Sequence, residues 1–329
     1  MLKRLATLPL VTAALVAAIL VLPPPAAGQA PKVTATLRLD WVPGPHHIGP
    51  LLAVQRGYYA QEGIDLSVQP GKGSGSTVQV VAAGRDLFGF ADAGTMAIAA
   101  SKGAPAIMVA NTTSRGPVGI ITVGKKIDAP KELEGKTIGL VPGAADHVAL
   151  LAVMKKYGIP ESAYRTIAIE AAAKVPALLS KKVDMIPGFR FGDYLRTYVQ
   201  NKDAKITLFS DWGVNLLGNG YLVATSTLEQ KPELVRGFLR ATLRGWKDAI
   251  ADPKAGVAAL LTAFPETNRE FAELGLPLVI EHMQSDATKG KPLGWMAEED
   301  WKMTLEVMKS AGLEGNLPPR SFYRNLVEP

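Results

Sequence analysis

Residues 39–68 constrain the fold more than any other stretch, because they predict a strand, a loop rich in ring side chains, a helix and a second strand. Leucines alternate with polar residues at its start, which indicates a strand, and Pro43 and Pro45 then end regular pairing. Apolar residues recur at helical spacing over 50–58, and 64–68 again has a strand pattern. The stretch therefore predicts a β-α-β opening with a ligand-binding loop between two rigid elements.

The first 28 residues have the three-part plan of a cleaved secretory signal, with Lys3 and Arg4 ahead of an apolar run and small residues at its end. An uncleaved membrane anchor is the alternative, but the run has only about 18 residues and three prolines, Pro23 to Pro25, follow it. The chain contains no cysteine, which excludes a disulfide, a cysteine-linked lipid and a thiolate ligand or nucleophile. We therefore expect a free periplasmic protein.

Strand-like and helix-like runs continue to alternate as far as Thr225. Alternation of this kind predicts an α/β fold in which helices cover a parallel sheet. A mature chain of about 300 residues is at the limit for a single core, so we expect two lobes. From Pro232 onward the pattern is helical, and the first helix carries its apolar residues on one face.

Charge and motifs exclude several classes of function. Removal of residues 1–28 lowers the formal net charge from +6 to +4, and interspersed lysines and acids leave no basic stripe for nucleic acid. The G-x-S-x-G and H-E-x-x-H motifs are missing. The four histidines, at 46, 47, 147 and 282, do not have the spacing of a metal site together with acidic partners. We expect neither a metal site nor a cofactor.

Three ring side chains, those of Trp41, His46 and His47, belong to the first predicted loop. An indole face stacks on a flat ring, and an imidazole donates or accepts a hydrogen bond in the ring plane. These residue types suit a planar heteroaromatic ligand or an oxyanion. The alternative is that Trp41 packs at the edge of the lobe and that one histidine faces solvent.

Two further loops in the first half suit a ligand. The loop at 71–77 combines glycines and free backbone amides with hydroxyl groups from Ser74, Ser76 and Thr77. It lacks the spacing of a nucleotide phosphate loop, and an ordinary flexible connection is the alternative. Asp92 and Thr95 follow a strand at its carboxyl end, where ligands bind in open α/β sheets, although Thr95 also suits a helix cap.

In the second half, Phe189, Arg190 and Asp193 follow a strand that ends at Pro187. A carboxylate there accepts hydrogen bonds from an N–H edge, whereas an arginine pairs with an acidic ligand. Asp193 is also a candidate helix cap. We expect it to face Trp41 across a cleft. Trp212 is a further candidate to frame a ring, with burial in a core as its alternative.

Several of these segments resemble one family. The loop with its tryptophan, proline and histidine, followed by GYYAQEGID at 57–65, is similar to the opening of the thiamine-pyrimidine-precursor group of solute-binding proteins. That group belongs with the sulfonate, taurine and nitrate binders of ABC importers. Further similarity covers 80–93 and 132–140 and returns at 188–193.

The resemblance implies a type II periplasmic binding protein, with two α/β lobes joined by a two-strand hinge and the ligand in the interlobe cleft. It carries His47 over as a ligand contact, and it makes Asp193 the counterpart of a glutamate in a G-aromatic-R-x-x-E segment. We expect hinge crossings near 116–118 and 223–226. The resemblance implies four parts. Residues 1–28 are a signal peptide, and 29–117 are the first part of lobe 1. Lobe 2 spans 118–225, and 226–329 form a helical return of lobe 1.

The chain also departs from the pyrimidine-precursor pattern. Gly44 stands where the family motif has an asparagine. A G-V-P-x-Y-x-E segment is changed at three positions, which here are Asn215, Leu217 and Asn219. These departures leave the ligand open among thiamine-pyrimidine precursors, flavin-like rings, aromatic acids and sulfonates.

The implied function is that of the periplasmic solute-binding component of an ABC importer. Such a protein captures a small planar heteroaromatic or anionic molecule by hinge closure and delivers it to the permease. We expect a monomer. One alternative is an exported ligand-sensing protein that reports to a membrane sensor. Another is an enzyme like the fungal pyrimidine synthase, but its lysine and consumed histidine would fall by resemblance where this chain has Ala91 and Thr95.

Overall fold

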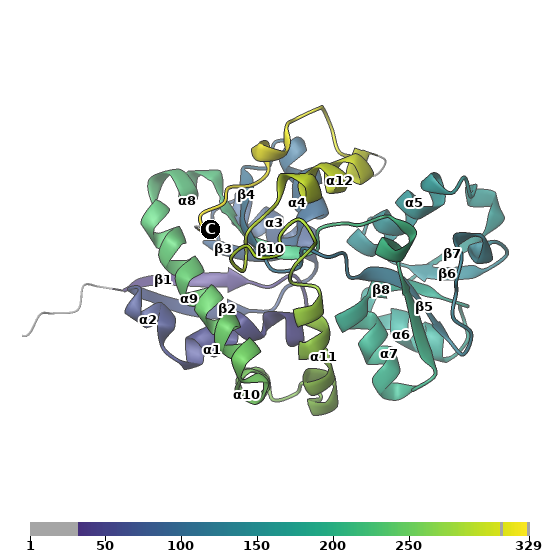
Figure 1. The fold of residues 1–329 in the computed structure, drawn as a ribbon, viewed down its shortest axis with the longest axis horizontal. Helices are drawn as coiled ribbons and strands as arrows, with labels where there is room; N and C mark the ends of the chain where they lie inside the picture. The colour runs from purple at the N-terminus through teal and green to yellow at the C-terminus, as the bar shows by residue number, and fades with distance from the viewer. Residues whose placement is uncertain (1–31, 310–311, 328–329) are drawn as a thin grey trace, which may run out of the picture. The chain divides into compact units, whose positions relative to one another are not determined.

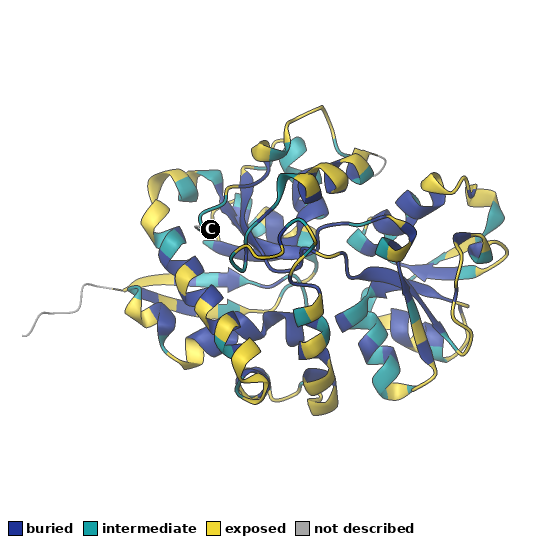
Figure 2. Ribbon diagram, viewed as in Figure 1, coloured by how far each residue is buried: buried dark blue, intermediate teal, exposed yellow. Residues whose placement is uncertain are grey.

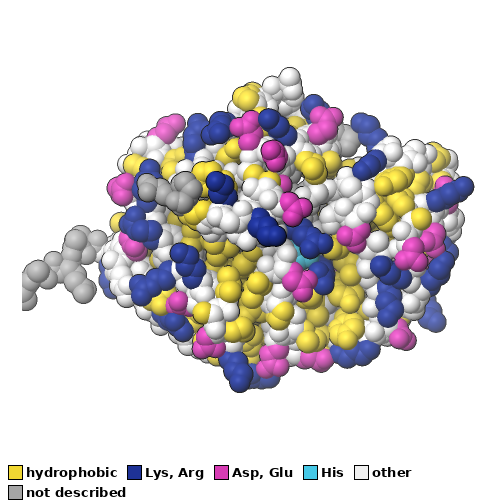
Figure 3. Space-filling view, viewed as in Figure 1, with side chains coloured by type: hydrophobic (Ala, Val, Ile, Leu, Met, Phe, Trp, Pro, Cys, Tyr) yellow, Lys and Arg dark blue, Asp and Glu magenta, His cyan; other side chains and the backbone are white. Residues whose placement is uncertain are grey.

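The computed structural model describes residues 32–309 and 312–327. The expected signal segment, residues 1–28, lies outside the described residues. Within the described part of the chain, no helix is both long enough and apolar enough to cross a membrane. Basic and acidic side chains are interspersed over the face drawn in Figure 3.

The first sheet has five strands in the order β2-β1-β3-β10-β4 (Figure 1). Its strands are β1 (Val33–Arg38), β2 (Ile64–Gln69), β3 (Phe88–Asp92), β4 (Ala106–Asn111) and β10 (Asn219–Ala224). β1 runs parallel to β2 and β3, as the β-α-β opening predicts. β10 runs antiparallel to both β3 and β4, so the sheet is mixed and not purely parallel.

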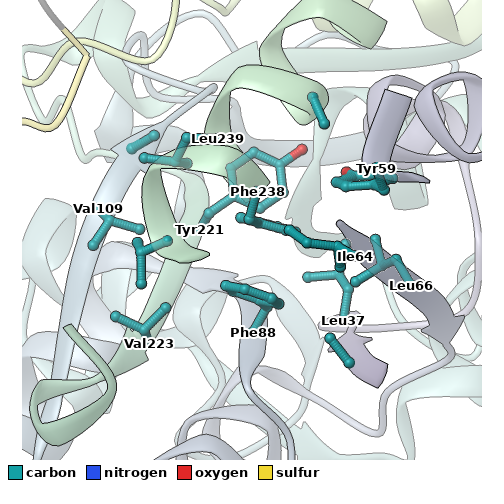
Figure 4. Packing of buried hydrophobic residues seen from close by; sticks show 14 of the residues in the cluster. Leu37, Tyr59, Ile64, Leu66, Phe88, Val109, Tyr221, Val223, Phe238 and Leu239 are labelled. Atoms are coloured by element: carbon teal, nitrogen blue, oxygen red, sulfur yellow. The ribbon is translucent and has the colours of Figure 1, made fainter. Parts of the chain in front are cut away.

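Aliphatic and aromatic side chains together fill the core beside this sheet (Figure 4). The rings of Phe88, on β3, and Phe238 stack with centroids 3.8 Å apart and planes at 8°. Such a pair adds about 0.5–1.5 kcal/mol to what its buried area contributes. The buried indole of Trp246 donates a hydrogen bond from Nε1 to the hydroxyl of Tyr221, which anchors the helical region to β10.

The second lobe contains an antiparallel sheet in the order β8-β5-β9 and a parallel pair, β6 and β7. The expectation of a parallel sheet therefore fails for the main sheet of this lobe. The strands are β5 (Val118–Val123), β6 (Thr137–Leu140), β7 (Arg165–Ala168), β8 (Ile186–Phe189) and β9 (Ala204–Leu208). Its helices are α5 (Ala145–Lys156), α6 (Lys174–Leu179) and α7 (Leu195–Gln200).

The chain returns to the first sheet earlier than expected. Every residue of β10 is buried, and the strand pairs with β3 and β4, so the second lobe ends before Asn219 and not at residue 225. The two segments that connect the lobes are hydrogen-bonded to each other. The Gly218 amide donates to the Thr113 carbonyl over 2.8 Å, and the Gly116 amide donates to Asn215 Oδ1 over 2.7 Å. The predicted crossing near 223–226 is therefore wrong, because a strand pattern alone does not reveal which sheet receives the strand.

Helices cover the first sheet (Figure 2). Those of the amino-terminal part are α1 (Ile48–Gln55), α2 (Tyr58–Gln61), α3 (Ser74–Ala82) and α4 (Ala93–Ser101). The carboxyl-terminal helices are α8 (Thr225–Gln230), α9 (Pro232–Ala251), α10 (Pro253–Ala263), α11 (Arg269–Glu281) and α12 (Glu298–Lys309). Glycines allow α1 and α9 to touch, because a Cβ atom at Gly245 would lie 2.2 Å from the carbonyl oxygen of Gly49.

Candidate functional site

Polar side chains gather at one edge of the first sheet. Asp40 follows β1, and Asp92 is the last residue of β3. Asn219 is the first residue of the antiparallel strand β10, and it lies opposite Asp92 in the ladder. An antiparallel strand starts where its neighbour ends, so topology brings these three residues to the same edge.

His47 is locked beneath this edge. The Gly44 amide donates to His47 Nδ1 over 3.1 Å, and His47 Nε2 lies 2.8 Å from Asp40 Oδ1. Because Nδ1 accepts a hydrogen bond, the proton of the neutral ring sits on Nε2 and is donated to Asp40. The ring is fully buried, and burial lowers the pKa of His47 to about 4. His47 is thus neutral at pH 7 and holds the loop.

Asp40 is the centre of the cluster. Burial by itself would raise the pKa of this carboxyl group, but the two imidazoles of His46 and His47 lower it well below its usual range. Asp40 Oδ2 also accepts a hydrogen bond of 2.7 Å from Asn219 Nδ2. The ionised carboxylate therefore ties the first loop to β10, two segments far apart in the sequence.

His46 lies on the other side of Asp40, with Nε2 3.6 Å from Asp40 Oδ1. Its ring is 3.8 Å from the ring of His47 and 5.1 Å from that of Phe191, a second-lobe residue. Only 8% of His46 is exposed, and its Nδ1 has no hydrogen-bond partner. His46 is therefore the loop histidine that remains available for a further contact.

Asp40, His46 and His47 place three potential metal-ligand atoms within 4.8 Å of one another. The bond from the Gly44 amide leaves the proton of His47 on the nitrogen that faces Asp40. His47 would have to lose this proton before it could bind a cation. The contacts therefore fit a hydrogen-bonded cluster better than a metal centre.

A pocket of about 150 Å³ lies between the amino-terminal ends of α4 and α5. It is lined by Asp92, Thr95, Ile98, Gly143, Ala145, Val148 and Met308. Asp92 Oδ1 accepts a hydrogen bond of 2.8 Å from the Thr95 amide and so caps α4. Burial raises the pKa of Asp92 to about 6. The helix cap is therefore Asp92 and not Thr95 as predicted, and contact of this segment with a ligand stays a prediction.

The first-lobe loop residues divide between scaffold and surface. Thr77 is fully buried and donates to the Leu39 carbonyl over 2.7 Å, so it joins the glycine loop to β1. Ser74 Oγ accepts a hydrogen bond of 3.0 Å from the Asp92 amide. Ser76 is exposed and donates to Gly73. Trp41 is half-buried, and its side chain remains a candidate for stacking.

The charged residues predicted in the second lobe are already paired. Lys174 is buried, contacts Asp146, and donates to Asp193 Oδ2 over 2.7 Å. Arg190 donates to Glu281 Oε2 over 2.7 Å. The Asp193 carboxylate and the Arg190 guanidinium therefore each have a protein partner, and their contact with a ligand stays a prediction.

The aromatic residues of this lobe have different surroundings. Trp212 packs in the second-lobe core, where its ring stacks on Phe209 and its Nε1 donates to the Asp128 carbonyl over 3.2 Å. The alternative of core burial therefore fits Trp212. Phe189 is half-buried with its ring 6.0 Å from that of Phe191. Phe191, the second ring of the same predicted segment, is the ring that reaches His46.

Sequence reasoning did not select three other residues of the cluster and its surroundings: Asp40, Asn219 and Lys174. A signal for Asp40 was present, because it directly precedes Trp41 on the ring-rich loop. Asn219 was noted only as a departure from a family pattern. Lys174 carried no signal, since its two carboxylate partners lie 28 and 19 residues away in the sequence.

Comparisons with known proteins agree with this architecture. The chain is 28% identical over 304 residues to the riboflavin-binding protein RibY of Chloroflexus aurantiacus, which covers 88% of this chain and 85% of that protein. It is 25% identical to the formylaminopyrimidine-binding protein of Halalkalibacterium halodurans, over 83% of each chain. A relative named as an enzyme, 4-amino-5-hydroxymethyl-2-methylpyrimidine phosphate synthase of Legionella pneumophila, is 27% identical over 71% of this chain and 75% of its own.

Among solved structures, the periplasmic aliphatic sulphonate binding protein SsuA of Escherichia coli superposes with a TM-score of 0.68. It is 14% identical to this chain, and the match covers 84% of this chain and 91% of SsuA. This likeness establishes the type II periplasmic-binding-protein fold. The profile of the NMT1/THI5-like family matches residues 44–256, which is more than half of the sequence. The chain therefore belongs to the NMT1/THI5-like family.

Proposed function

We propose that this protein is the periplasmic solute-binding component of an ABC importer and that it captures a small planar molecule between its two lobes. The observation that carries the proposal is the polar edge of the first sheet, where Asp40, His46 and Asn219 meet beside Phe191 of the second lobe. A pocket lined by both lobes lies at the same edge, next to Asp92. Each lobe thus supplies part of one binding surface, as hinge closure requires.

The relatives support the class of ligand. Two of them are named for the heteroaromatic compounds riboflavin and formylaminopyrimidine. A half-buried Trp41 on the loop beside Asp40 suits stacking on such a ring. We infer that Trp41, His46, Ser74, Asp92, Thr95 and Phe189 surround the ligand, and that His47 and Thr77 hold the loops that present it.

We further propose that the protein is not an enzyme and that it acts as a monomer that delivers its ligand to an inner-membrane permease. Against the synthase-like alternative, Ala91 and Thr95 stand where the synthase resemblance places a lysine and a histidine. Mass spectrometry of a ligand before and after incubation with the protein separates the two functions. Recovery of a chemically altered ligand in amounts above one per protein would contradict the binding function.

A thermal-shift screen tests the proposal directly. The panel would contain riboflavin, formylaminopyrimidine, cytosine, benzoate, ethanesulfonate and nitrate. A ligand at 100 times its dissociation constant stabilises the folded protein by about 2.7 kcal/mol, which is readily seen as a rise in melting temperature. Small-angle scattering should then show that the protein becomes more compact with the active compound. If no planar compound raises the melting temperature, the proposed function is wrong.

A further inference from the structure

Two buried polar atoms without hydrogen-bond partners lie in the Asp40 cluster. Among the described residues, four buried side-chain nitrogen or oxygen atoms lack a partner, and two of these are His46 Nδ1 and Asn219 Oδ1. His46 is 8% exposed and Asn219 is 1% exposed. Buried polar groups in native proteins are nearly always paired, so two unpaired atoms beside one carboxylate call for a physical reason.

The unpaired atom of Asn219 is a hydrogen-bond acceptor, and Nδ1 of His46 is an acceptor in the tautomer that carries its proton on Nε2. Ionised Asp40 can only accept, so the atom of Asn219 that faces it at 2.7 Å is the NH₂ group, and the unpaired atom is the carbonyl oxygen. The same carboxylate, 3.6 Å from His46 Nε2, favours the proton on that nitrogen. In the tautomer with its proton on Nε2, the ring has a free lone pair on Nδ1.

Carboxylates flank these acceptors, and a cation whose field reaches the neighbouring His47, Arg196, has its guanidinium over the ring of Phe271. Asp40 lies between His46 and Asn219, and Asp92 is the ladder partner of Asn219. Two cations of the second lobe are engaged elsewhere: Lys174 is paired with Asp146 and Asp193, and Arg190 is paired with Glu281. An anion that can only accept hydrogen bonds would meet acceptors and a carboxylate here, which is an unfavourable combination.

We propose that Asn219 Oδ1 and His46 Nδ1 accept hydrogen bonds from the ligand, and that the ligand is a neutral or cationic heteroaromatic ring with N–H donors along its edge. The proposal rests on the solute-binding function and adds the chemical class of the solute. Phe191 now covers His46, with ring centroids 5.1 Å apart, so the donor edge enters when the second lobe moves away. Acceptor-only anions such as sulfonates and nitrate are excluded.

The test is calorimetry with one matched pair of probes and one contrast between chemical classes. Riboflavin carries one ring N–H, and 3-methylriboflavin has a methyl group in its place. Cytosine, with its N–H edge, is compared with ethanesulfonate, which has none. We expect the parent protein to bind riboflavin or cytosine and not ethanesulfonate. If riboflavin binds, methylation should weaken binding by about 5- to 150-fold, the range for a lost hydrogen bond with an unpaired partner.

Two variants assign the effect to the proposed atoms. His46→Phe keeps a ring beside Phe191 and removes both ring nitrogens, and Asn219→Leu keeps the branched shape and removes Oδ1 together with the Nδ2 donor to Asp40. Each should weaken the bound N–H probe by about 5- to 150-fold, whereas Asn316→Leu, at an exposed asparagine, should not. Urea unfolding of each ligand-free protein shows whether the variant still folds. If Asn219→Leu does not fold, the affinity of His46→Phe for the N–H probe alone tests the inference.

The outcomes separate the two proposals. Tight binding of ethanesulfonate or nitrate by the parent protein would leave the solute-binding function intact and overturn the donor-edge inference. The inference is equally wrong if His46→Phe binds the N–H probe as tightly as the parent. If no probe binds at all, the solute-binding function fails, and the inference that rests on it fails as well.

Discussion

Replacement of Asp40 by asparagine should destabilise the protein, because two donors point at its two oxygens. His47 Nε2 lies 2.8 Å from Oδ1, and Asn219 Nδ2 lies 2.7 Å from Oδ2. An asparagine offers one acceptor oxygen, so one donor would face an NH₂ group. A lost charge-assisted hydrogen bond costs about 1.5–3 kcal/mol, and relief from the burial of a charge offsets a part of this. We expect a net loss of about 1–3 kcal/mol in the free energy of unfolding.

Urea unfolding at pH 7, followed by circular dichroism, measures the loss. Asp65→Asn is the matched control, because Asp65 is an exposed aspartate on β2 of the same sheet, and it should change stability by less than about 0.5 kcal/mol. The double variant Asp40→Asn/Asn219→Asp is the decisive arm. The amide at position 40 can then accept from His47 and donate to the new carboxylate at position 219, which restores both bonds.

The double variant should therefore be more stable than the sum of the two single changes allows, with a coupling energy of about 1 kcal/mol or more. Additive losses would refute the hydrogen-bond scheme, since they would mean that positions 40 and 219 do not share a bond in solution. An Asp40→Asn variant as stable as Asp65→Asn would refute it as well.

Three other predictions follow from the contacts. Burial lowers the pKa of both His47 and His282 to about 4, so the unfolded chain binds more protons below pH 6.5, and urea midpoints should fall as the pH falls from 6.5 to 4. Asp92, with its pKa raised to about 6, opposes this trend because it binds more protons in the folded state. The free energy of unfolding should still rise by about 1.4 kcal/mol per pH unit near pH 5. A stability that does not change with pH in this range would contradict the buried neutral histidines. Gly245→Ala should lower stability by about 1–3 kcal/mol in thermal unfolding, because its Cβ would lie 2.2 Å from a backbone oxygen of α1. A Cβ atom at Gly237, on the same helix, would meet side-chain atoms, with Glu62 Oε2 at 3.1 Å and Glu62 Cβ at 3.3 Å, and no backbone atom. Gly237→Ala should therefore destabilise less than Gly245→Ala, and equal effects would refute the close approach of α1 and α9. Trp41→Ala should weaken binding of the ligand found in the screen by about 1–3 kcal/mol, as measured by calorimetry. Trp295→Ala is the control, because Trp295 is another half-buried tryptophan. Unchanged affinity of Trp41→Ala would show that Trp41 does not contact the ligand.

The sequence predicts local structure well where the physical cause is local. The strand, loop and helix around residues 37–58 follow from alternation, prolines and helical spacing, and in the structure β1 ends at Arg38 and α1 begins at Ile48. The ring-rich loop and the segment at Asp92 lie at the polar edge, because residues that follow parallel strands meet at one end of a sheet.

Long-range partners are what the sequence does not predict. Asp193 has the chemistry of a ligand contact, yet Lys174 satisfies it, and this pairing depends on how α6 packs beside the segment after β8. Asn219 joins the site only because β10 inserts antiparallel between β3 and β4. His47 differs from its neighbour His46 because one backbone amide, that of Gly44, selects its tautomer.

The bonds between the two crossing segments have a mechanical consequence. The Gly218 amide is tied to the Thr113 carbonyl and the Gly116 amide to the side chain of Asn215, so the two connections form a short braced ribbon. A braced ribbon bends as one body, whereas two separate tethers would also permit twisting and sliding. Motion between the lobes is thereby reduced towards a single rotation, and the polar edge at Asp40 meets the second lobe in the same alignment each time it closes.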